Sequence, residues 1–512
     1  MRLHNIILAS LLISGASGAS ATAPSDSVGA LARVARMEAP VQMRPVGVFL
    51  SNPAAMGFWN DCSYSRIEAV GSLDRADRAR VVEQGRGHTL GNILASSYMR
   101  LSESTTVWGR AGFTTGQIRD VVWNNAADYE LVSPYVFGDS VGGNLQTRRY
   151  AFSGGYAGRS GQWSWGAQAS YRAAIDYRNR DPRDKIVVSD LKVAVGGTRA
   201  IGEYAVGLGA DLRVYNQESS VEFFNPNNDI RAYAMLGLGN VYTRFSGSSN
   251  LDASYKGLGF GGSLQLFPRR GAGLMANVEF GYLRMKQVLR NYNNLDLTRA
   301  DTYRLTAIVA YTRAVGKWSI APELRFGASR RLGYENVFGS TVGNTYLKIG
   351  SRRNYWADRA GAAVALPAMV GLSDGLKLDF RPSVEYAYTH TDYRRPNRAT
   401  ETGAWRPALR AGVSWIFGRN MLRFAMEGAH TAASSLRCKL DGLDPDSAIG
   451  RTVLQNHAMA SADVNSAGAS LAYDREFFPG GIVGGVELRA HHSHYNALGN
   501  INMAEAVVSV RF

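Results

Sequence analysis

Hydrophobic and polar residues alternate along most of this chain. From Ser63 onward the alternation has a period of two and continues in segments of about ten to sixteen residues, which predicts antiparallel strands with one apolar and one polar face. In one such segment, Tyr204, Val206, Leu208, Ala210 and Leu212 share the apolar face. We expect strands near 63–72, 88–101, 104–119, 146–158, 162–177, 185–199, 203–217, 254–267, 272–288, 300–314, 317–333, 355–367, 375–391, 404–417, 421–434, 462–476, 482–495 and 502–512.

The connections between these segments alternate between tight turns and longer polar loops. The longest loops are expected at 120–145, 218–253, 334–354 and 435–461. Outer-membrane barrels keep their long loops outside and their short turns in the periplasm. The pattern therefore predicts an all-β fold, a transmembrane antiparallel up-and-down β-barrel of about 18 strands, or about 16 if one hairpin is lost. The first and twelfth strands are the weakest, and the strand-like segment 230–245 is placed in an extracellular excursion.

Aromatic residues distinguish a membrane barrel from a soluble repeat protein with the same period. They lie on the apolar face and mostly near strand ends, as interfacial girdles require. They are Trp163, Trp165, Tyr177, Tyr303, Tyr311, Trp318, Tyr386, Tyr388, Trp405, Trp415 and Phe417.

Both ends of the chain agree with export to an outer membrane. An apolar stretch from Ile6 to Ile13 is followed by small residues and Ala19-Ser20-Ala21, which predicts a signal peptide over 1–21. The last strand ends in Phe512, a typical signal for the barrel assembly machinery of Gram-negative bacteria. We expect a plug or periplasmic segment over 22–61 and the barrel over 62–512, located in the outer membrane.

Composition and charge change this picture little. The 56 glycines and 25 tyrosines against 15 prolines suit one large sheet, whose apolar surface faces lipid and needs no apolar interior. The net charge of +15 could indicate nucleic acid, but the basic clusters fall between predicted strands. These clusters are Arg178 to Lys185, Arg330-Arg331, Arg352-Arg353 and Arg394-Arg395. We expect outer-membrane lipid and lipopolysaccharide phosphates as their partners, or plain solvation, and no nucleic acid.

The polar faces predict a lumen of mixed charge. An acid followed two residues later by arginine recurs on inward positions, as in Asp211/Arg213, Glu323/Arg325, Asp379/Arg381 and Glu487/Arg489, with Arg423 and Glu427 on a neighbouring strand. These groups either brace the barrel through arginine–carboxylate pairs or orient an anionic solute. Because acids and bases nearly balance, we expect bracing and no strong anion selectivity.

The segment 22–61 contains a possible amphipathic helix from Gly29 to Met37, and then Asn52, Pro53 and Ala54. This Asn-Pro-Ala triplet resembles the hatch motif of the fatty-acid and aromatic-hydrocarbon outer-membrane channels. That family has fewer strands and apolar pockets, so the resemblance implies only a possible hatch.

Longer motifs resemble another family. Ser133-Pro-Tyr135, Asp139-Ser-Val-Gly-Gly143, Tyr150-Ala-Phe-Ser-Gly-Gly-Tyr156, Trp163-Ser-Trp-Gly166 and Tyr177-Arg-Asn-Arg-Asp-Pro-Arg183 resemble a Bacteroidota family of outer-membrane β-barrel proteins of unknown function. The resemblance spans most of the chain and implies fold and location, without a ligand or an activity.

Reactive side chains offer weaker candidates. His492 and His494 should face outward and Ser493 inward, which makes a Ser–His contact awkward, and no third metal ligand accompanies the two histidines. Asp139, Asp176, Asp190 and His390 could be drawn into an omptin-like protease site, although their spacing does not require it. Cys62 and Cys438 should lie at opposite ends of the barrel and form no bridge unless the N-terminal segment threads the lumen. We expect no cofactor and no enzyme.

The leading hypothesis is an outer-membrane channel or facilitator for an unidentified small solute. The alternative is a non-conducting barrel that acts as an interaction scaffold or adhesion surface through its loops. A surface lipid hydrolase is the third hypothesis.

Overall fold

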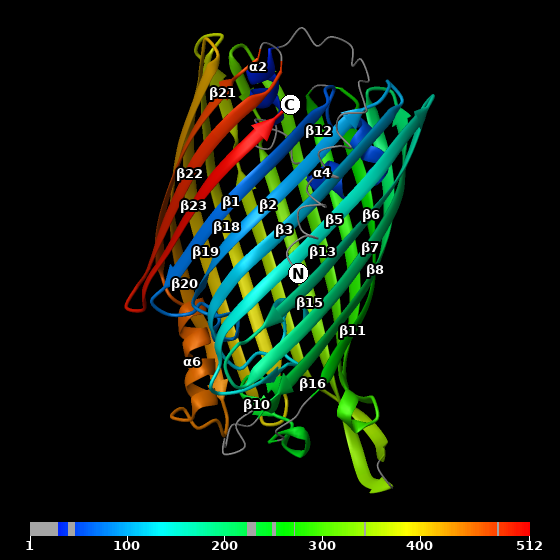
Figure 1. Cartoon of the computed structure of the whole chain (residues 1–512), viewed down its shortest axis with the longest axis vertical. Coiled ribbons are helices and arrows are strands. Elements are labelled where there is room, and N and C mark those ends of the chain that lie inside the picture. The colour runs from blue at the N-terminus through cyan, green and yellow to red at the C-terminus, as the bar shows by residue number, and fades with distance from the viewer. Residues whose placement is uncertain are drawn as a thin grey trace, which may run out of the picture.

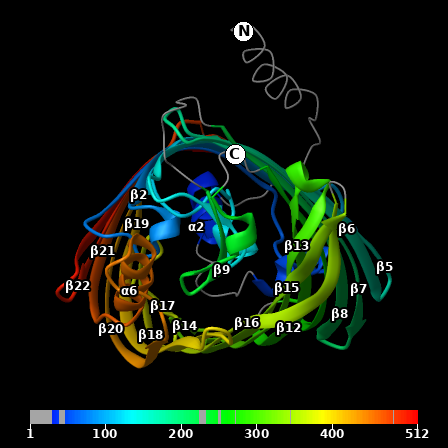
Figure 2. The same cartoon turned by 90° about the horizontal axis from the view of Figure 1, so that it is seen from below.

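A closed antiparallel barrel dominates the computed structural model, which describes residues 29–38, 47–222, 232–247, 252–270, 272–342, 345–478 and 481–512 (Figures 1 and 2). Its 18 strands follow one another in chain order, and the barrel closes where β1 pairs with β23, from Arg66 opposite Arg511 to Ala76 opposite Ile501. The predicted fold class is confirmed. The predicted signal peptide lies outside the described residues.

Each predicted strand has a counterpart in the barrel. The strands are β1 (Tyr64–Ala76), β2 (Gly87–Arg100), β3 (Thr105–Val121), β5 (Gly143–Ser160), β6 (Trp163–Tyr177), β7 (Arg183–Ile201), β8 (Tyr204–Glu222), β11 (Ala253–Pro268), β12 (Gly273–Leu289), β13 (Leu295–Val315), β14 (Trp318–Ile320) continued by β15 (Glu323–Val342), β16 (Thr345–Ala365) continued by β17 (Ala368–Gly371), β18 (Leu376–Tyr393), β19 (Arg398–Phe417), β20 (Asn420–Leu440), β21 (Val464–Glu476), β22 (Val483–Tyr495) and β23 (Gly499–Arg511). Pro322 and Pro367 mark the two interruptions, because proline cannot donate to a ladder.

The two ends of the barrel differ in their connections. At one end the strands reverse in tight turns, where Gly161, Gly202, Gly316 and Gly418 adopt φ values between 55° and 58° that favour glycine. This turn end also carries the C-terminus and α2 (Ala30–Glu38), at the top of Figure 1. The opposite loop end carries the long connections, including α6 (Ala448–Ala460).

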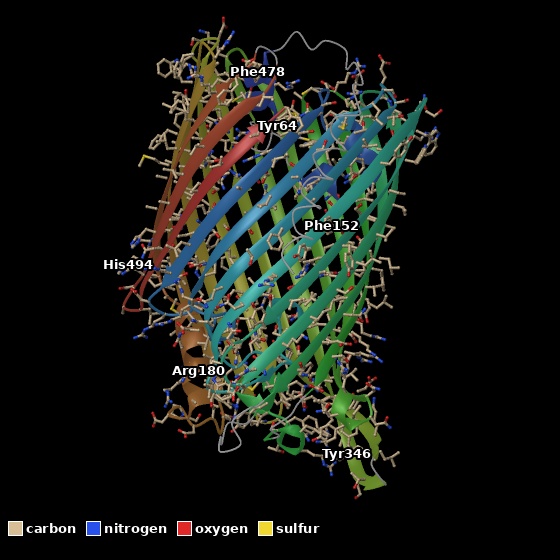
Figure 3. All side chains as sticks on the ribbon, viewed as in Figure 1. Tyr64, Phe152, Arg180, Tyr346, Phe478 and His494 are labelled. Carbon is tan, nitrogen blue, oxygen red and sulfur yellow. The ribbon has the colours of Figure 1, made fainter. Side chains whose placement is uncertain are left out.

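The outer surface of the barrel is apolar. Leu208, Leu258 and Val508 are each more than half exposed, and the tryptophans predicted for the girdles, such as Trp163 and Trp405, are similarly exposed. Figure 3 shows one such outward side chain, Phe152 of β5, midway along the barrel. A surface of this kind requires a hydrocarbon environment. Among the described helices, none has the length and apolarity to cross a membrane.

Several strands continue past the predicted boundaries at the loop end. The expected loop 334–354 is largely a hairpin, because β15 reaches Val342 and β16 begins at Thr345. β20 likewise reaches Leu440, so Cys438 lies on a strand. Beyond a membrane, a strand is held by its hydrogen-bond ladder and needs no lipid-facing apolar row, so hydropathy does not reveal it. Cys62 is buried and Cys438 is exposed, and the two are not joined by a disulfide.

The interior contains apolar clusters, although a barrel that faces lipid does not need them. The segments between strands fold into the lumen and bury their own side chains there, in contact with inward strand residues. One cluster at the loop end includes Val121, Trp123, Phe137, Tyr215 and Phe245. The sequence analysis places the strand-like segment 230–245 in an extracellular excursion. Its described part contributes β9 (Tyr233–Gly237) and β10 (Asn240–Val241), which form a separate small sheet with β4 (Phe137–Gly138) and pack against inward strand residues at the loop end.

Candidate functional site

The residues before β1 line the lumen near the turn end. We call residues 47–61 the hatch; it contains α4 (Gly47–Leu50) and the 3-10 helix η1 (Pro53–Phe58). Asn52 is fully buried, caps η1 through the Ala54 amide at 2.9 Å, and donates its side-chain amide to the carbonyls of Gly197 and Leu208. The Asn-Pro-Ala triplet therefore fixes the hatch to β7 and β8.

Glycines make room for this contact on the inner wall. A Cβ at Gly196 would lie 1.9 Å from Asn52 Oδ1, and one at Gly166 would lie 2.6 Å from the Ala54 nitrogen. A Cβ at Gly207 would also meet the Asn52 amide, at 2.8 Å. Side chains at these positions would displace the hatch. The hatch can therefore lie against this part of the wall only because the wall residues are glycines.

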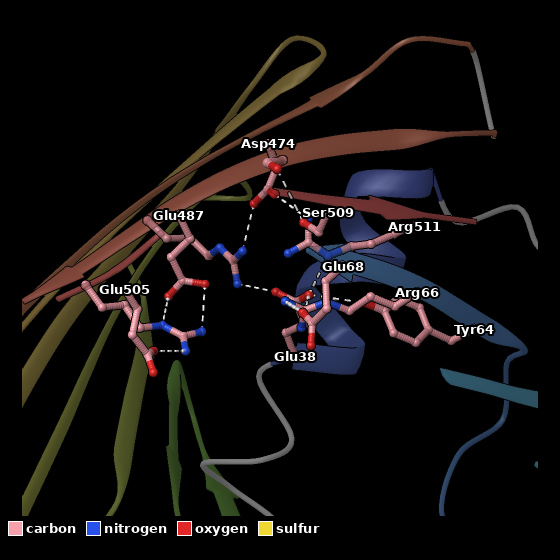
Figure 4. Close-up of polar contacts among 12 residues, drawn as sticks. Glu38, Tyr64, Arg66, Glu68, Asp474, Glu487, Glu505, Ser509 and Arg511 are labelled. Carbon is pink, nitrogen blue, oxygen red and sulfur yellow. Dashed lines mark hydrogen bonds and ion pairs between the residues drawn. The ribbon is translucent and has the colours of Figure 1, made fainter. Parts of the chain in front are cut away.

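The helix α2 docks on another part of the wall. Its apolar residues Leu31 and Val34 pack against Met421 and Val483. At its end, Glu38 contacts three arginines of the wall: Arg66 of β1, Arg423 of β20 and Arg511 of β23 (Figure 4).

Glu38 is the electrostatic link between α2 and the strands that close the barrel. Burial by itself would raise the pKa of its carboxyl, but the nearby cations Arg423, Arg511 and Arg66 outweigh burial and lower the pKa. Glu38 is therefore ionised at neutral pH, and α2 is held by charge-assisted contacts.

The loop end is covered by four inter-strand connections, which we call the cap. They are residues 77–86 with η2 (Val82–Gln84), residues 122–142 with α5 (Tyr129–Val132), residues 232–247 with η3 (Thr243–Phe245), and α6. Asn456 of α6 joins two of them, because its side chain accepts from the Val82 amide at 2.9 Å and donates to Glu83 at 2.8 Å. Figure 2 shows α6 and β9 within the outline of the barrel.

An arginine clamps the cap to the barrel. Arg178 follows β6 directly, and its guanidinium lies 2.8 Å from Asp139 Oδ2 and 3.1 Å from Asp184 Oδ2. It also donates to the carbonyls of Val121 and Asn124. Arg178 was expected among solvent-facing loop charges, but its side chain is almost completely buried, because the cap folds over it. Arg331 was expected there too; it faces inward and donates to the Ser133 carbonyl of the cap.

Beside the cap the lumen contains a chamber of about 1260 Å³, lined by cap residues such as Asp128 and by inward residues of the barrel strands. Its charged residues form a network on β6, β7 and β8: Arg172 reaches both Asp128 of the cap at 2.6 Å and Asp190 at 3.2 Å. Asp190 also pairs with Arg213 at 2.8 Å, and Asp211 pairs with Lys192 at 3.3 Å. These pairs cross from strand to strand and brace the wall.

The predicted lumen residues are distributed between this chamber and other parts of the inner wall. Asp211 and Arg213 line the chamber, although they pair with β7 and not with each other. A second cavity of about 480 Å³ lies elsewhere in the lumen, and the predicted residues Glu323, Arg325, Arg381 and Glu427 line it.

The remaining predicted lumen residues are engaged in ion pairs. Asp379 pairs with Arg410 of β19 at 2.8 Å, and Arg423 pairs with Glu38 and with Asp474. Glu487 and Arg489 pair along their own strand at 2.8 Å, and Arg489 also reaches Glu505 at 3.2 Å, so this acid–arginine repeat is a local brace (Figure 4).

Sequence reasoning missed several of the charged groups that matter most in the chamber. Arg110, Arg172 and Arg331 all lie at alternate positions on the polar face of their strands, and this position could have identified them as lumen residues. On the strand of Arg110, however, Trp108 also faces inward and contacts the hatch region, donating to Gln168 at 2.9 Å. An aromatic residue is normally assigned to the lipid-facing side of a strand. The inward Trp108 therefore makes the inner face of this strand hard to recognise from the sequence.

The candidate catalytic groups are not assembled into an accessible site. His492 and His494 are exposed and contact Asn502 and Asn500, as their outward parity predicts. The Ser–His contact considered awkward does form, but with His491, whose Nε2 lies 3.2 Å from Ser493 Oγ. Ser493 is only 4% exposed, so its hydroxyl faces neither lipid nor open lumen.

The four residues considered for a protease have separate partners. Asp139 binds Arg178, Asp176 binds Arg149, Asp190 binds Arg213, and His390 lies near Asp392 and Glu401. Within the described ranges, no group of three or more acidic, histidine or cysteine side chains is arranged to hold a metal ion.

An apolar exterior, a polar braced lumen and a closed antiparallel ladder define the class of transmembrane β-barrels. The chain belongs to a family of unknown function, DUF6850, whose model matches residues 53–511. No curated protein sequence matches it.

Solved structures resemble the chain at low identity. The ferric enterobactin receptor PfeA of Pseudomonas aeruginosa, as a double mutant, matches with 8% identity and a TM-score of 0.36, over 88% of this chain and 81% of the receptor. The unliganded ferric citrate transporter FecA matches with 10% identity and a TM-score of 0.37, over 87% and 78%. The monoaromatic hydrocarbon channel CymD matches with 9% identity and a TM-score of 0.29, over 90% and 91%.

Proposed function

We propose that this protein is an outer-membrane channel or facilitator for a small solute, closed at the turn end by the hatch and at the loop end by the cap. The observation that carries the proposal is the polar chamber of about 1260 Å³ in the lumen, lined by inward strand residues and by cap residues such as Asp128 and Glu130. A barrel that served only as a scaffold would need neither a cavity of this size nor two separately anchored closures.

The two closures differ in the way they are held. The hatch rests on glycines and on the Asn52 amide, whereas the cap is clamped by Arg178. Each can therefore be released by a local change that leaves the barrel ladder intact. This separation makes the gating hypothesis testable.

The test is single-channel conductance in a planar bilayer for four proteins: the full chain, a chain lacking residues 22–61, Arg178→Met, and the combination. We expect little conductance from the full chain and steady conductance from the combination. Heat-modifiable gel mobility confirms that each barrel is folded. No conductance from the folded combination would rule out a diffusion channel.

A scaffold that binds partners through the loop end is the second candidate. The β15–β16 hairpin projects from this end, where Tyr346 is labelled in Figure 3, and it exposes Leu347 and Ile349 by 61% and 64%. Shortening 218–253 or 435–461 should abolish partner binding if the protein is a scaffold and should alter conductance if it is a channel. A lipid hydrolase would require Ser493→Ala to abolish lipid hydrolysis by the purified protein.

Lipopolysaccharide phosphates are the proposed outer partners at the loop end. Arg394 lies over the Trp356 ring at 5.2 Å, and Arg330 is an exposed side chain paired with Asp358 at 2.7 Å. Such arginines near an aromatic girdle suit phosphate pairing. At the other end, β23 with its exposed Phe512 is the proposed signal for the barrel assembly machinery.

A further inference from the structure

The acidic and basic residues that line the chamber differ in how far they are engaged by other residues of the protein. Among the acids that line it, Asp190, Asp211, Asp128, Glu130 and Glu68 are all held in ion pairs with basic residues. Glu83 is hydrogen-bonded to Asn456, and Glu279 accepts from Asn277. The acidic groups are therefore already engaged by the protein.

Two arginines that line the same chamber are not engaged in this way. Arg110 of β3 and Arg304 of β13 form no hydrogen bond or ion pair with the part of the chain that the structure describes, and both side chains are exposed to the lumen. Six strands, β5 to β8, β11 and β12, separate β3 from β13 in the barrel order, so the two arginines approach the chamber from different sides of the barrel.

The residues next to these arginines are small. Arg110 lies between Ser96 of β2 and Ser153 of β5 in the strand register. Arg304 lies between Gly281 of β12 and Ser329 of β15. Neighbours without bulk leave each guanidinium accessible, and three of the four supply a hydroxyl that can donate a hydrogen bond.

We infer that the chamber binds small organic anions, carboxylates or phosphate esters, at Arg110 and at Arg304. A guanidinium without an internal partner in a polar lumen offers planar donors that match either group. Rings of arginine are a common basis of anion selection in pores. The expectation of weak anion selectivity rested on counting charges along the sequence, whereas five of the acids that line the chamber are paired with basic residues and these two arginines have no ion pair within the described residues.

This inference rests on the proposed function for its view of the chamber as part of a solute path, but binding can be measured without conduction. The probes are glucuronate for the carboxylate, glucose 6-phosphate for the phosphate ester, and glucose as the neutral control. Isothermal titration calorimetry is carried out on the full chain in detergent and on Arg178→Met, whose loosened cap gives access to the chamber.

We expect at least one anion to bind and glucose not to bind. Arg110→Gln or Arg304→Gln should each weaken anion binding at the substituted position roughly tenfold, since a charge-assisted contact is lost there. Arg437→Gln, an exposed arginine on β20 that does not line the chamber, is the matched control and should leave affinity unchanged. Comparing the two anions shows whether carboxylate or phosphate is the preferred group.

Binding of glucose as strong as that of both anions, unchanged anion binding in the double Arg110→Gln/Arg304→Gln variant, or no anion binding by folded Arg178→Met would overturn the inference. Conductance separates this result from the proposed function. Anion binding without conductance in any variant would refute the channel and leave the site. Conductance without arginine-dependent anion binding would leave the channel and refute the site.

Discussion

Arg178 Nη1 lies 2.8 Å from Asp139 Oδ2, and both side chains are almost completely withdrawn from solvent. Arg178 follows the barrel strand β6 and Asp139 belongs to the cap, so this pair joins the cap to the wall of the barrel. Asp139 is itself fixed, because its Oδ1 accepts from the amides of Val141 and Gly142.

We expect Arg178→Met to release the cap, because Asp139 and Asp184 would then be buried without their cation. Breaking a buried pair in this way costs about 3–5 kcal/mol. Cleavage within residues 122–142 by a protease added to the folded protein measures the release. Arg180→Met is the matched control: Arg180 lies in the same turn, is exposed, and should change nothing (Figure 3). Equal cleavage of the two variants would contradict the clamp.

Gly196→Ala should displace the hatch. The new methyl group would lie 1.9 Å from Asn52 Oδ1, and this overpacking costs about 1–3 kcal/mol. The neighbouring Gly197→Ala is a close control, since a Cβ there meets nothing nearer than the Ser164 carbonyl at 3.7 Å. Conductance measured with the cap released by Arg178→Met should rise for Gly196→Ala and stay constant for Gly197→Ala.

Glu38→Gln should detach α2 from the wall, because the side chain loses its charge-assisted contacts with Arg66, Arg423 and Arg511, each worth about 1.5–3 kcal/mol. The native cysteines report this change. Cys62 is buried with its sulfur 3.7 Å from Met37 of α2, whereas Cys438 is exposed. We expect faster maleimide labelling of Cys62 in the variant, with Cys438 as the internal reference.

The control for that experiment is Glu103→Gln, a change in an exposed turn.

The contacts of Glu38 with the three arginines also make the docking of α2 depend on pH. Since the folded pKa of Glu38 is lowered, the docking energy is present above the unfolded pKa of about 4.5 and is lost as the pH falls through the lower folded pKa. If the rate of Cys62 labelling did not change as the pH was lowered, Glu38 would not be the residue that holds α2.

The cap should open more readily as the pH rises. Burial between α6 and α5 raises the pKa of Glu83, more than its hydrogen bond from Asn456 lowers it. A raised folded pKa means that the closed cap is most stable below the unfolded pKa and loses this stability as the pH rises through the folded value. Conductance of the chain lacking residues 22–61 should therefore increase with pH, and Glu83→Gln should remove the dependence.

Asp446→Asn provides the comparison for that pH series, because Asp446 is exposed and lies just before α6. It should retain the pH dependence of the parent protein. A conductance that fell with rising pH, or a pH dependence that survived Glu83→Gln, would show that Glu83 does not control the cap.

The barrel itself could be predicted from the sequence. Every second residue of a barrel strand faces lipid, so apolar residues such as Leu208 and Leu212 alternate with polar neighbours. This local pattern predicts the fold, the outward face of each strand and the number of strands. The same alternation predicts Asp211, Arg213 and Glu323 on the inner face, and in the structure these residues line the two cavities.

The contents of the lumen could not be predicted in the same way. Contacts such as Asn52 with Gly196, or Asp139 with Arg178, join residues far apart in the chain, and neither partner carries a periodic pattern. Trp108 faces the hatch region and not lipid, so tryptophan occurs on both the inner and the outer face of the barrel and does not identify the face by itself.

By itself, therefore, the sequence determined a membrane barrel with a polar inner face, because a repeated lipid contact leaves a repeated pattern. Only the tertiary structure decided that the lumen contains a hatch near the turn end and a cap at the loop end. It alone also decided which charges are paired. The pairing of Asp190 with Arg213, and the lack of a partner for Arg110 and Arg304 among the described residues, depend on distances across strands that composition does not record.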